Sequence, residues 1–452
     1  MTFFLETYGC QMNTAESAAL TEILRERGWS AAEGGEDADL VLLNTCSVRE
    51  TAEKRLLGRL AQYAALKKKR PSRSFTLVVA GCMAQRLGGK LREDYRAVDY
   101  VMGTGARSIF PQILEAAEKG KRGAAVDPVN IKPAFTFSSF HLEKGQFRAL
   151  VPIMHGCDNF CSYCIVPYVR GREISRSPAS ILEEIRRLAE NGVREICLLG
   201  QNVNTYRWQE NADPLCGPAG VLDFPGLLEL IAKALEKTGI RRARFLSANP
   251  KDFSSRAIRV MAENPVFCRH LHLCVQHGSN AVLKAMNRKY TRETYLSLVE
   301  EIRTAMPGIS LSTDILVGFP GETEEDLRLT LDLMESVKFL YAYMYHYNPR
   351  EGTAAFSLPN RVDEAVKRER LGRVISLQKK HTRELLKSRV GKREVVLIEG
   401  ISRKNADELI CRTERDEMAV VPGAAALAGS YARVTLSSLR GNTFRADGLE
   451  LL

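Results

Sequence analysis

The sequence lacks any apolar run that approaches the roughly 18 residues required by a membrane-spanning helix. The segment from Met1 to Glu6 has no basic residues ahead of an apolar stretch, so we expect no secretory signal and a cytoplasmic protein without a membrane partner. The eleven cysteines are odd in number, which in a chain without a signal argues against a disulfide framework. We therefore expect clustered thiols to serve metal binding or catalysis.

Acidic residues are missing between Lys54 and Arg73, a segment that carries eight basic residues. The alternative to a binding role for this segment is a solvated helix face, but such a face would usually mix both signs of charge. The formal net charge of the chain is +11, which favours a polyanionic partner. We therefore expect this basic segment to bind phosphate groups, and we consider the same role for three arginines that could instead be simple surface residues: Arg170, Arg172 and Arg176.

A length of 452 residues exceeds one ordinary core, and the pattern of apolar runs predicts an α/β multidomain protein. Residues 1–119 alternate strand and helix signals and predict a small doubly wound α/β domain. Its expected buried parallel strands are Thr2–Tyr8, Leu40–Asn44, Thr76–Ala80 and Tyr100–Met102. A segment with little periodicity, from Lys119 to about Lys144, is typical of a linker.

Two further domains are predicted after the linker. Residues 143–375 contain six β/α units, which favour an incomplete (β/α)6 barrel over a closed eight-stranded one. The expected barrel strands are Ala149–Met154, Glu195–Leu199, Ala243–Ser247, His270–Val275, Ser310–Val317 and Phe339–His346. Residues 379–452 show short strands joined by Gly and polar turns, which predicts a small C-terminal antiparallel β-barrel.

The most specific motif is the C-x3-C-x2-C run of Cys157, Cys161 and Cys164, just after the first barrel strand. Three thiolates on one tight loop can hold three irons of a 4Fe–4S cluster, whereas complete protein ligation uses four cysteines. The fourth iron stays open, and it can chelate the amino and carboxylate groups of a small molecule and pass it an electron. Zinc sites usually have two separated cysteine pairs, which this spacing does not provide.

A second cysteine trio lies in the N-terminal domain, where Cys10, Cys46 and Cys82 each follow an apolar strand. Successive members are 36 positions apart, about one β-α-β repeat. Parallel strands bring their C-terminal ends to one edge of the sheet, so we expect the three thiols to converge there. Gly9 and Gly81 precede two of them and allow close backbone approach. This trio also offers three ligands, which predicts a second cluster with an open iron.

Both trios and their surroundings resemble the methylthiotransferase family of radical S-adenosylmethionine enzymes along nearly the whole chain. The similar blocks are Glu6–Asn13, Asn44–Glu50, Ala80–Arg86, Leu199–Asn204 and Asp314–Thr323. The trio Gln11-Met12-Asn13 resembles the branch that modifies isopentenyladenosine in transfer RNA. The C-terminal barrel, with Gly400 and Arg412–Arg415, looks like the RNA-binding TRAM domain. Alternatives are the branches for threonylcarbamoyladenosine or a ribosomal-protein aspartate, and a zinc-stabilised RNA-binding protein without catalysis.

The resemblance implies radical methylthiolation of carbon 2 of isopentenyladenosine beside the anticodon. One S-adenosylmethionine would methylate a sulfur held at the auxiliary cluster of Cys10, Cys46 and Cys82. A second would be cleaved at the cluster of Cys157, Cys161 and Cys164 to give a 5′-deoxyadenosyl radical. The protein would position and shield these cofactors. The implied partners are a tRNA anticodon stem-loop, an electron donor of the flavodoxin or ferredoxin type, and proteins that supply sulfur and clusters.

Further residues are expected to contact the cofactor or the substrate. Polar residues at the C-terminal ends of barrel strands more often face ligands than not, although turn and loop-anchoring roles are the alternative. These candidates are Gly200, Gln201, Asn202, Gln276 and Asp314. By the resemblance, Tyr163 lies near the adenine, with a packing role as its alternative.

The sequence also departs from the family pattern. Asn249 stands where histidine is usual, and Cys274 and His277 stand where proline and serine are usual. Five cysteines have no metal-ligand spacing and are predicted to be core or surface thiols: Cys197, Cys216, Cys268, Cys274 and Cys411.

Overall fold

A computed structural model of the chain describes residues 1–47, 50–69, 75–120, 145–210, 215 and 220–452. These residues belong to two compact units. The first comprises Met1–Leu142, Met154–Asp158 and Cys164–Arg176, and the second comprises Glu143–Ile153, Asn159–Tyr163 and Ser177–Leu452. Most of the predicted linker, Arg70 and Arg73 of the basic segment, Val48 and Arg49 of one family block, and Cys216 lie outside the described residues. Within the described ranges, no helix has the length and apolar character needed to cross a membrane.

The first unit is built on a parallel sheet with the strand order β2-β1-β3-β4-β5. Its strands are β1 (Thr2–Thr7), β2 (Ser30–Ala31), β3 (Leu40–Thr45), β4 (Thr76–Gly81) and β5 (Tyr100–Met102). All four predicted strands are confirmed. The additional β2 consists of two exposed residues, and a strand without an apolar run leaves no signal in the sequence.

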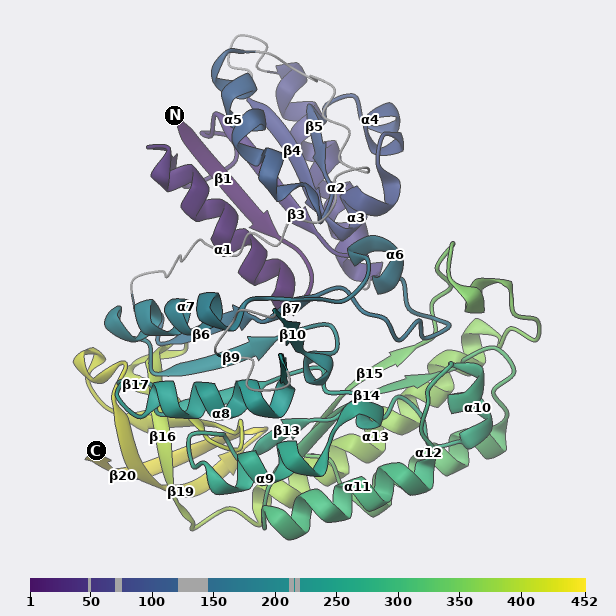
Figure 1. The fold of residues 1–452 in the computed structure, drawn as a ribbon, viewed down its shortest axis with the longest axis vertical. Helices are drawn as coiled ribbons and strands as arrows, with labels where there is room; N and C mark the ends of the chain where they lie inside the picture. The colour runs from purple at the N-terminus through teal and green to yellow at the C-terminus, as the bar shows by residue number, and fades with distance from the viewer. Residues whose placement is uncertain (48–49, 70–74, 121–144, 211–214, 216–219) are drawn as a thin grey trace. The chain divides into compact units, whose positions relative to one another are not determined.

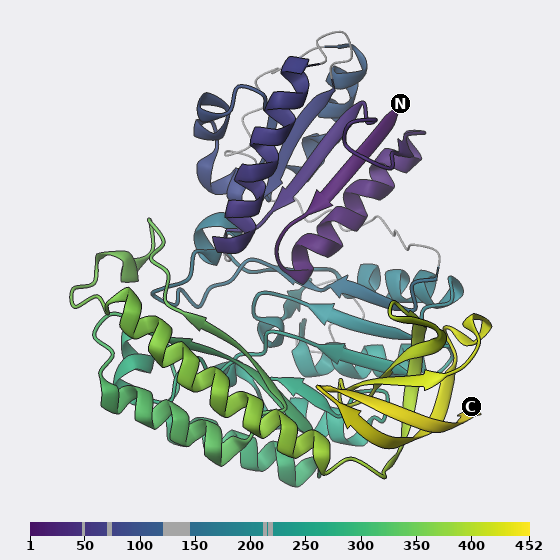
Figure 2. The same cartoon turned by 180° about the vertical axis from the view of Figure 1, so that it is seen from behind.

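Helices cover both faces of this sheet, so the doubly wound prediction is confirmed (Figures 1 and 2). One face packs against α1 (Gln11–Glu26) and α5 (Phe110–Glu118). The other packs against α2 (Glu50–Lys69), α3 (Cys82–Leu87) and α4 (Lys90–Asp94). Because both faces are covered, every residue of β3 is buried. The strand order reverses between β1 and β3, and sheets of this kind bind ligands at the carboxyl ends of the strands beside such a reversal.

The second unit contains six parallel strands that follow one another in chain order. They are β6 (Arg148–Pro152), β9 (Glu195–Leu199), β12 (Arg242–Phe245), β13 (His270–His272), β14 (Ser310–Val317) and β15 (Tyr341–His346). The first three and the last three form separate sheets, and a parallel bridge between Ala248 and Leu273 links them. The predicted incomplete barrel is therefore confirmed.

The helices of this partial barrel lie between its strands and after the last of them. They are α7 (Pro178–Glu190), α8 (Phe224–Leu235), α9 (Ser255–Glu263), α10 (Asn280–Ala285), α11 (Arg292–Ala305), α12 (Glu324–Val337) and α13 (Glu364–Lys387). Capping boxes at Thr291 and Thr323 define where α11 and α12 begin. A shorter element of the second unit is the hairpin β10 (Arg207–Gln209) with β11 (Val221–Asp223). The first unit also contains α6 (Val166–Arg170) and the pair β7 (Met154–His155) with β8 (Ile174–Ser175).

The C-terminal strands close into a barrel in the order β16-β17-β18-β20-β19 (Figure 2, yellow). They are β16 (Arg393–Ser402), β17 (Asn405–Thr413), β18 (Met418–Pro422), β19 (Tyr431–Arg440) and β20 (Thr443–Leu451). The predicted small barrel is confirmed with one difference, because β18 and β20 pair in parallel. β19 is antiparallel to both β16 and β20. β20 therefore runs in the same direction as β18, beside which it lies in the barrel.

Charged residues connect this C-terminal barrel to the starts of the partial-barrel strands. The buried Glu195 carboxylate pairs with Arg244 at 2.7 Å and with Arg148 at 2.8 Å, and Arg148 also reaches Glu399 at 3.1 Å. Burial raises the pKa of Glu195, but Arg244 and Arg148 lower it more, so its pKa lies below the usual range. Arg242 donates to the carbonyl oxygen of Arg412 at 2.7 Å. The C-terminal barrel therefore occupies the amino ends of the strands and leaves their carboxyl ends for chemistry.

Candidate metal centres

Cys10, Cys46 and Cys82 converge at one edge of the sheet of the first unit. Cys46 directly follows β3, Cys82 directly follows β4, and Cys10 is the N-cap residue of α1, three residues after β1. These three strands are neighbours, in the order β1-β3-β4. The predicted convergence is therefore confirmed as a matter of topology. Cys10 also precedes the first residue of α1, Gln11, as its N-cap.

Two glycines make room at this edge. Gly9 and Gly81 have φ angles of +143° and +93°, which favour glycine. A β-carbon at Gly9 would lie 2.4 Å from the Cβ of Cys46, and one at Gly81 would lie 2.4 Å from the carbonyl oxygen of Thr45. Neither contact is sterically possible, so the close approach of the backbone around the thiols requires glycine at both positions.

Asn13 connects the loops that carry the first trio. Its fully buried amide donates to the carbonyl oxygen of Thr45 at 2.8 Å and to Oδ1 of Asn44 at 3.1 Å. Its Oδ1 accepts from the Cys10 thiol at 3.1 Å, and Asn44 Nδ2 donates to the Asn13 carbonyl oxygen at 2.9 Å. Asn13 thus has a structural role beside the Cys10 thiol, in the segment whose residues Gln11 to Asn13 indicate the family branch.

The thiols of the trio differ in their electrostatic surroundings. A hydrogen bond with the Cys46 side chain lowers the pKa of Cys10 to about 6, with a smaller contribution from Arg170 and against the effect of burial. Burial raises the pKa of Cys82 to about 11, although Arg170 acts in the opposite direction. Thiolate is the form that binds metal, and Arg170 is the cation that favours it at both positions.

Arg170 is buried, which corrects its sequence interpretation. Its guanidinium pairs with the Glu16 carboxylate at 2.7 Å, and the two side chains are 2% and 5% exposed. Both readings of Arg170, as a phosphate contact and as a surface residue, are therefore wrong. Arg172 is exposed and pairs with Asp158 at 2.8 Å, and Arg176 is buried. A pair between residues 154 positions apart leaves no mark in local sequence patterns.

The second trio lies on the loop after β6, with Cys157 and Cys161 buried and Cys164 half-buried. Residues of this loop belong to both units. In the first unit, the Cys157 amide donates to the Gly171 carbonyl oxygen at 3.2 Å. Gly156 has a φ of +77°, and a β-carbon there would lie 2.0 Å from the carbonyl oxygen of Arg172. The backbone beside Cys157 thus requires glycine.

The Cys161 side of the loop is held by the residues after α10 in the second unit. Asn287 Nδ2 donates to the Phe160 carbonyl oxygen at 2.9 Å, and the Ser162 amide donates to the Met286 carbonyl oxygen at 3.0 Å. Phe160 has a left-handed φ of +44°, a conformation that a side chain disfavours. These hydrogen bonds stabilise the strained turn between the first two cysteines.

Arg288 is a half-buried cation at this loop that sequence reasoning missed. Its Nη1 lies 3.3 Å from Cys161 Sγ, and its Nη2 donates to the Cys274 carbonyl oxygen at 2.8 Å. Burial lowers the pKa of Arg288, but the neighbouring Tyr290, Tyr163 and Cys161 raise it more, so the guanidinium stays charged. Arg288 and Cys161 are 127 positions apart, so only the folded chain brings them together.

The other predicted site residues lie near the carboxyl ends of the barrel strands. Gly200, Gln201 and Asn202 directly follow β9. Gln276 has a left-handed φ of +68°, and its Nε2 donates to Asp314 Oδ2 at 3.3 Å, so the structure brings these two predicted residues together. Tyr163 packs against the apolar cluster that contains Val282 and Met286, as its packing alternative expected.

Three known protein families match successive segments of the chain. Residues 2–103 match the uncharacterized protein family UPF0004, residues 151–334 match the radical SAM superfamily, and residues 387–449 match the TRAM domain. The tRNA-2-methylthio-N(6)-dimethylallyladenosine synthase of Treponema denticola is 48% identical over 458 residues, covering 99% of this chain and 100% of the relative. The chain belongs to the family of tRNA-2-methylthio-N(6)-dimethylallyladenosine synthases.

Other relatives agree with this family. The synthase of the same name from Geobacter sulfurreducens is 42% identical and covers 96% of this chain and 94% of the relative. Among solved structures, the radical S-adenosylmethionine methyltransferase TsrM from Kitasatospora setae, with cobalamin and a 4Fe–4S cluster bound, has a TM-score of 0.59. The two chains are 17% identical, and the match covers 78% of this chain and 77% of the other, so this likeness concerns the fold alone.

Two of the three departures from the synthase family pattern have structural roles. The Asn249 side chain caps the short helical turn Pro250–Asp252, because its Oδ1 accepts a hydrogen bond from the Lys251 amide at 3.2 Å. His277 is fully buried, with Nε2 3.4 Å from Glu322 and Nδ1 3.2 Å from the Thr330 hydroxyl. Cys274 is also buried, but it lies beside other side chains that can bind metal.

Three other cysteines of this synthase family member are buried, as expected for core thiols: Cys197, Cys268 and Cys411. Burial raises the pKa of each of these thiols to about 12, which keeps them neutral and unreactive.

Proposed function

We propose that the protein is a tRNA methylthiotransferase that attaches a methylthio group to carbon 2 of isopentenyladenosine next to the anticodon. S-adenosylmethionine serves both as the methyl donor and as the radical source. The observation that carries this proposal is the 48% identity along the whole chain to a synthase of this activity. The branches for threonylcarbamoyladenosine and for a ribosomal-protein aspartate are not favoured, and neither is a zinc-stabilised protein without catalysis.

Each cysteine trio has a donor set suited to one 4Fe–4S cluster with an open iron, because it offers three thiols rather than four. Cys10, Cys46 and Cys82 would hold the auxiliary cluster, where Gly9 and Gly81 leave space that a β-carbon would fill. Cys157, Cys161 and Cys164 would hold the other, with Gly156 in a similar role. When bound, one cluster supplies the electron that cleaves S-adenosylmethionine, and the other carries the sulfur to be transferred.

The buried Arg170 and the half-buried Arg288 would balance the negative charge of these sites. Arg170, held by Glu16, acts on Cys10 and Cys82, and Arg288 lies 3.3 Å from Cys161 Sγ. A cation in a site of low dielectric stabilises nearby thiolates more strongly than one in water. Both arginines therefore favour the ligand form of the cysteines.

We assign contacts with S-adenosylmethionine or the substrate to residues at the carboxyl ends of the barrel strands: Tyr163, Gly200, Gln201, Asn202, Gln276 and Asp314. Within the described residues, Oε1 of Gln201 and Oδ1 of Asn202 are buried without a hydrogen-bond partner. Buried acceptors are costly unless they receive a donor. The amino group of S-adenosylmethionine provides such a donor, which supports the assignment of these two residues.

The three proposed domains divide the work. Residues 1–119 would hold the auxiliary cluster, 143–375 the radical chemistry, and 379–452 the RNA-binding TRAM barrel. The basic segment that begins at Lys54 lies on α2, and its last residues fall outside the described ranges. An anticodon loop suits this chemistry because its bases are readily unstacked.

A basic cavity of about 640 Å³ offers a further contact for the tRNA backbone. Lys251, Lys284, Arg288 and Lys289 line it. We expect the double variant Lys284→Ala with Lys289→Ala to bind tRNA more weakly. The slope of log K against log salt should become shallower by about 1 to 2, because binding with fewer phosphate contacts releases fewer counterions from the tRNA. Filter binding across a salt series measures this slope.

The matched control is Lys233→Ala, which removes an exposed lysine on α8 that does not line the cavity. An unchanged slope in the double variant would show that the cavity does not contact tRNA phosphates.

The reaction also requires partners outside the chain. We propose an electron donor of the flavodoxin or ferredoxin type and proteins that renew the sulfur and the clusters. We further propose that the protein works in the cytoplasm, where tRNA is modified.

Nucleoside mass spectrometry of tRNA from a strain that lacks the gene tests the proposed function. We expect 2-methylthio-isopentenyladenosine to disappear, isopentenyladenosine to accumulate in its place, and the wild-type gene to restore the modification. If the methylthio nucleoside persists in a strain with no second such enzyme, the proposal is wrong.

A further inference from the structure

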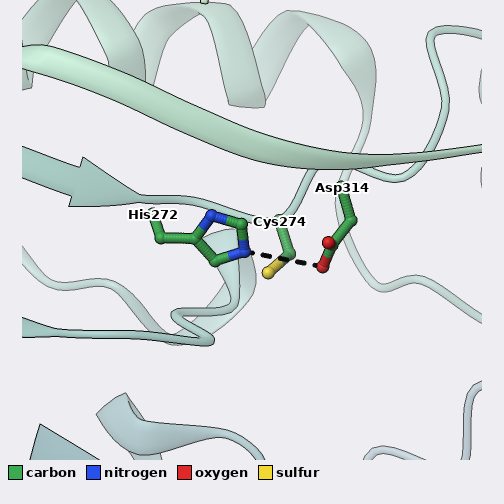
Figure 3. Close-up of side chains that lie close together, drawn as sticks. All are labelled: His272, Cys274 and Asp314. Atoms are coloured by element: carbon green, nitrogen blue, oxygen red, sulfur yellow. Dashed lines mark ion pairs between the residues drawn. The ribbon is translucent and has the colours of Figure 1, made fainter. Parts of the chain in front are cut away.

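Three side chains with metal-binding donors meet beside β13 and β14 of the second unit. His272 ends β13, Cys274 follows two residues later, and Asp314 lies in β14. One donor atom from each lies within 4.8 Å of the other two, and His272 Nε2 is 3.6 Å from Asp314 Oδ2. Figure 3 shows the Cys274 sulfur beside the line from the imidazole to the carboxylate. None of the three belongs to a cysteine trio.

The histidine is oriented by a residue of the neighbouring strand. Ser312, which pairs with His272 in the parallel register of β13 and β14, places its Oγ 2.9 Å from His272 Nδ1. This contact leaves Nε2 directed at Asp314. Histidines that bind metals almost always engage their second ring nitrogen in such a hydrogen bond, which fixes the tautomer and the ring plane.

The burial of the group suits an ion that has one open position. His272 and Cys274 are 4% and 8% exposed, whereas the Asp314 side chain is 26% exposed. The group is therefore closed on the histidine and cysteine sides and accessible at the carboxylate. Zinc sites with three protein ligands keep a fourth position for water or another ligand.

We propose that His272, Cys274 and Asp314 bind a divalent zinc ion, with a water molecule as the fourth ligand. Nitrogen, sulfur and oxygen donors together form a set that zinc accepts in tetrahedral geometry. Zinc–ligand bonds of about 2.0–2.3 Å place tetrahedral donors about 3.3–3.8 Å apart, and the 3.6 Å between His272 and Asp314 falls in this range. The site goes beyond the proposed function, because methyl transfer and radical formation need no third metal. It makes Asp314 a zinc ligand in place of the contact with S-adenosylmethionine or the substrate proposed above.

Arg288 separates this group from the second cysteine trio. One of its nitrogens reaches Cys161 Sγ at 3.3 Å, and the other reaches the backbone oxygen of Cys274 at 2.8 Å. The hydrogen bond from Arg288 thus goes to the Cys274 backbone, whereas the hydrogen-bond partner of the Cys274 thiol is the Asp314 carboxylate. Because Cys274 departs from the proline usual in the family, the zinc site would be a property of this chain.

Metal analysis of the reconstituted holoenzyme tests the site. The full chain is first loaded with both clusters, so that the six trio cysteines are occupied, then equilibrated with Zn²⁺ without oxygen and desalted. We expect about 1 zinc per chain in the wild type and a loss to background in Cys274→Ala. Cys268→Ala, which removes another buried thiol close to β13, should keep its zinc. An unchanged iron content would confirm that both variants fold.

Two further measurements examine the ligands themselves. X-ray absorption of zinc in the wild-type protein should give one sulfur at about 2.3 Å together with lighter donors at about 2.0–2.1 Å. Ser312→Ala should weaken zinc affinity about 10- to 100-fold in a chelator competition, because it frees the imidazole.

Absence of zinc in the wild type, a shell without sulfur, or full zinc in Cys274→Ala would overturn the proposal. None of these measurements uses tRNA or S-adenosylmethionine. Zinc binding by a protein that fails to modify tRNA would therefore support the site and refute only the proposed function.

Discussion

Replacing Cys10, Cys46 and Cys82 together with alanine is expected to abolish methylthio transfer to tRNA while reductive cleavage of S-adenosylmethionine continues. The three thiols lie at the carboxyl edge of β1, β3 and β4, apart in sequence from the loop assigned to the radical. Iron should fall from about eight to about four per chain, because one cluster of four is lost. Anaerobic assays of 5′-deoxyadenosine and of methylthiolated nucleoside measure both reactions in one sample.

A suitable control is Cys411→Ala, which removes a buried thiol in the core of the C-terminal barrel. It should keep both reactions and all of the iron. Full methylthio transfer by the triple variant would refute the role assigned to the trio. Loss of both reactions together with loss of nearly all the iron would instead indicate general damage to the fold, which circular dichroism can detect.

Replacing Cys157, Cys161 and Cys164 with alanine should have the complementary effect and stop both S-adenosylmethionine cleavage and methylthio transfer. Cleavage requires an open iron at this loop, and transfer requires the radical that cleavage produces. Iron should again fall to about four per chain, now through loss of the other cluster. The same two assays, with iron analysis, compare the two triple variants directly.

The pair of variants is informative because the expected patterns differ. One variant keeps cleavage and loses transfer, whereas the other loses both at the same iron content. Cleavage of S-adenosylmethionine that continues without Cys157, Cys161 and Cys164 would contradict the assignment of this loop.

Much of the fold was predictable because its signals are local. The buried strands β3 and β4 are apolar runs, and α11 and α12 begin at capping boxes that the sequence displays. The cysteine trios were predictable for a related reason. A regular β-α-β spacing puts Cys10, Cys46 and Cys82 at the ends of neighbouring strands, and the second trio lies within one short loop.

Other parts of the sites could not be predicted. Arg170 looked like one of several arginines beyond the cluster loop, yet it is buried against Glu16. Arg288 follows α10 and belongs to no motif in the sequence, yet its guanidinium contacts the Cys161 thiol. Cys274 had no metal-ligand spacing, because its partners are a histidine two residues away and an aspartate on the next strand.

Residue types, spacing and hydrophobic pattern were therefore enough to predict an α/β multidomain fold and six candidate cluster ligands, and the resemblance to a family implied the class of reaction. These properties follow from short stretches of chain and from the regular geometry of parallel strands. The tertiary structure alone decided which charges lie beside the thiols and which three side chains form the proposed zinc site. Such contacts join residues that are distant in sequence, and their energies depend on burial and orientation, which exist only after the strands and helices have packed.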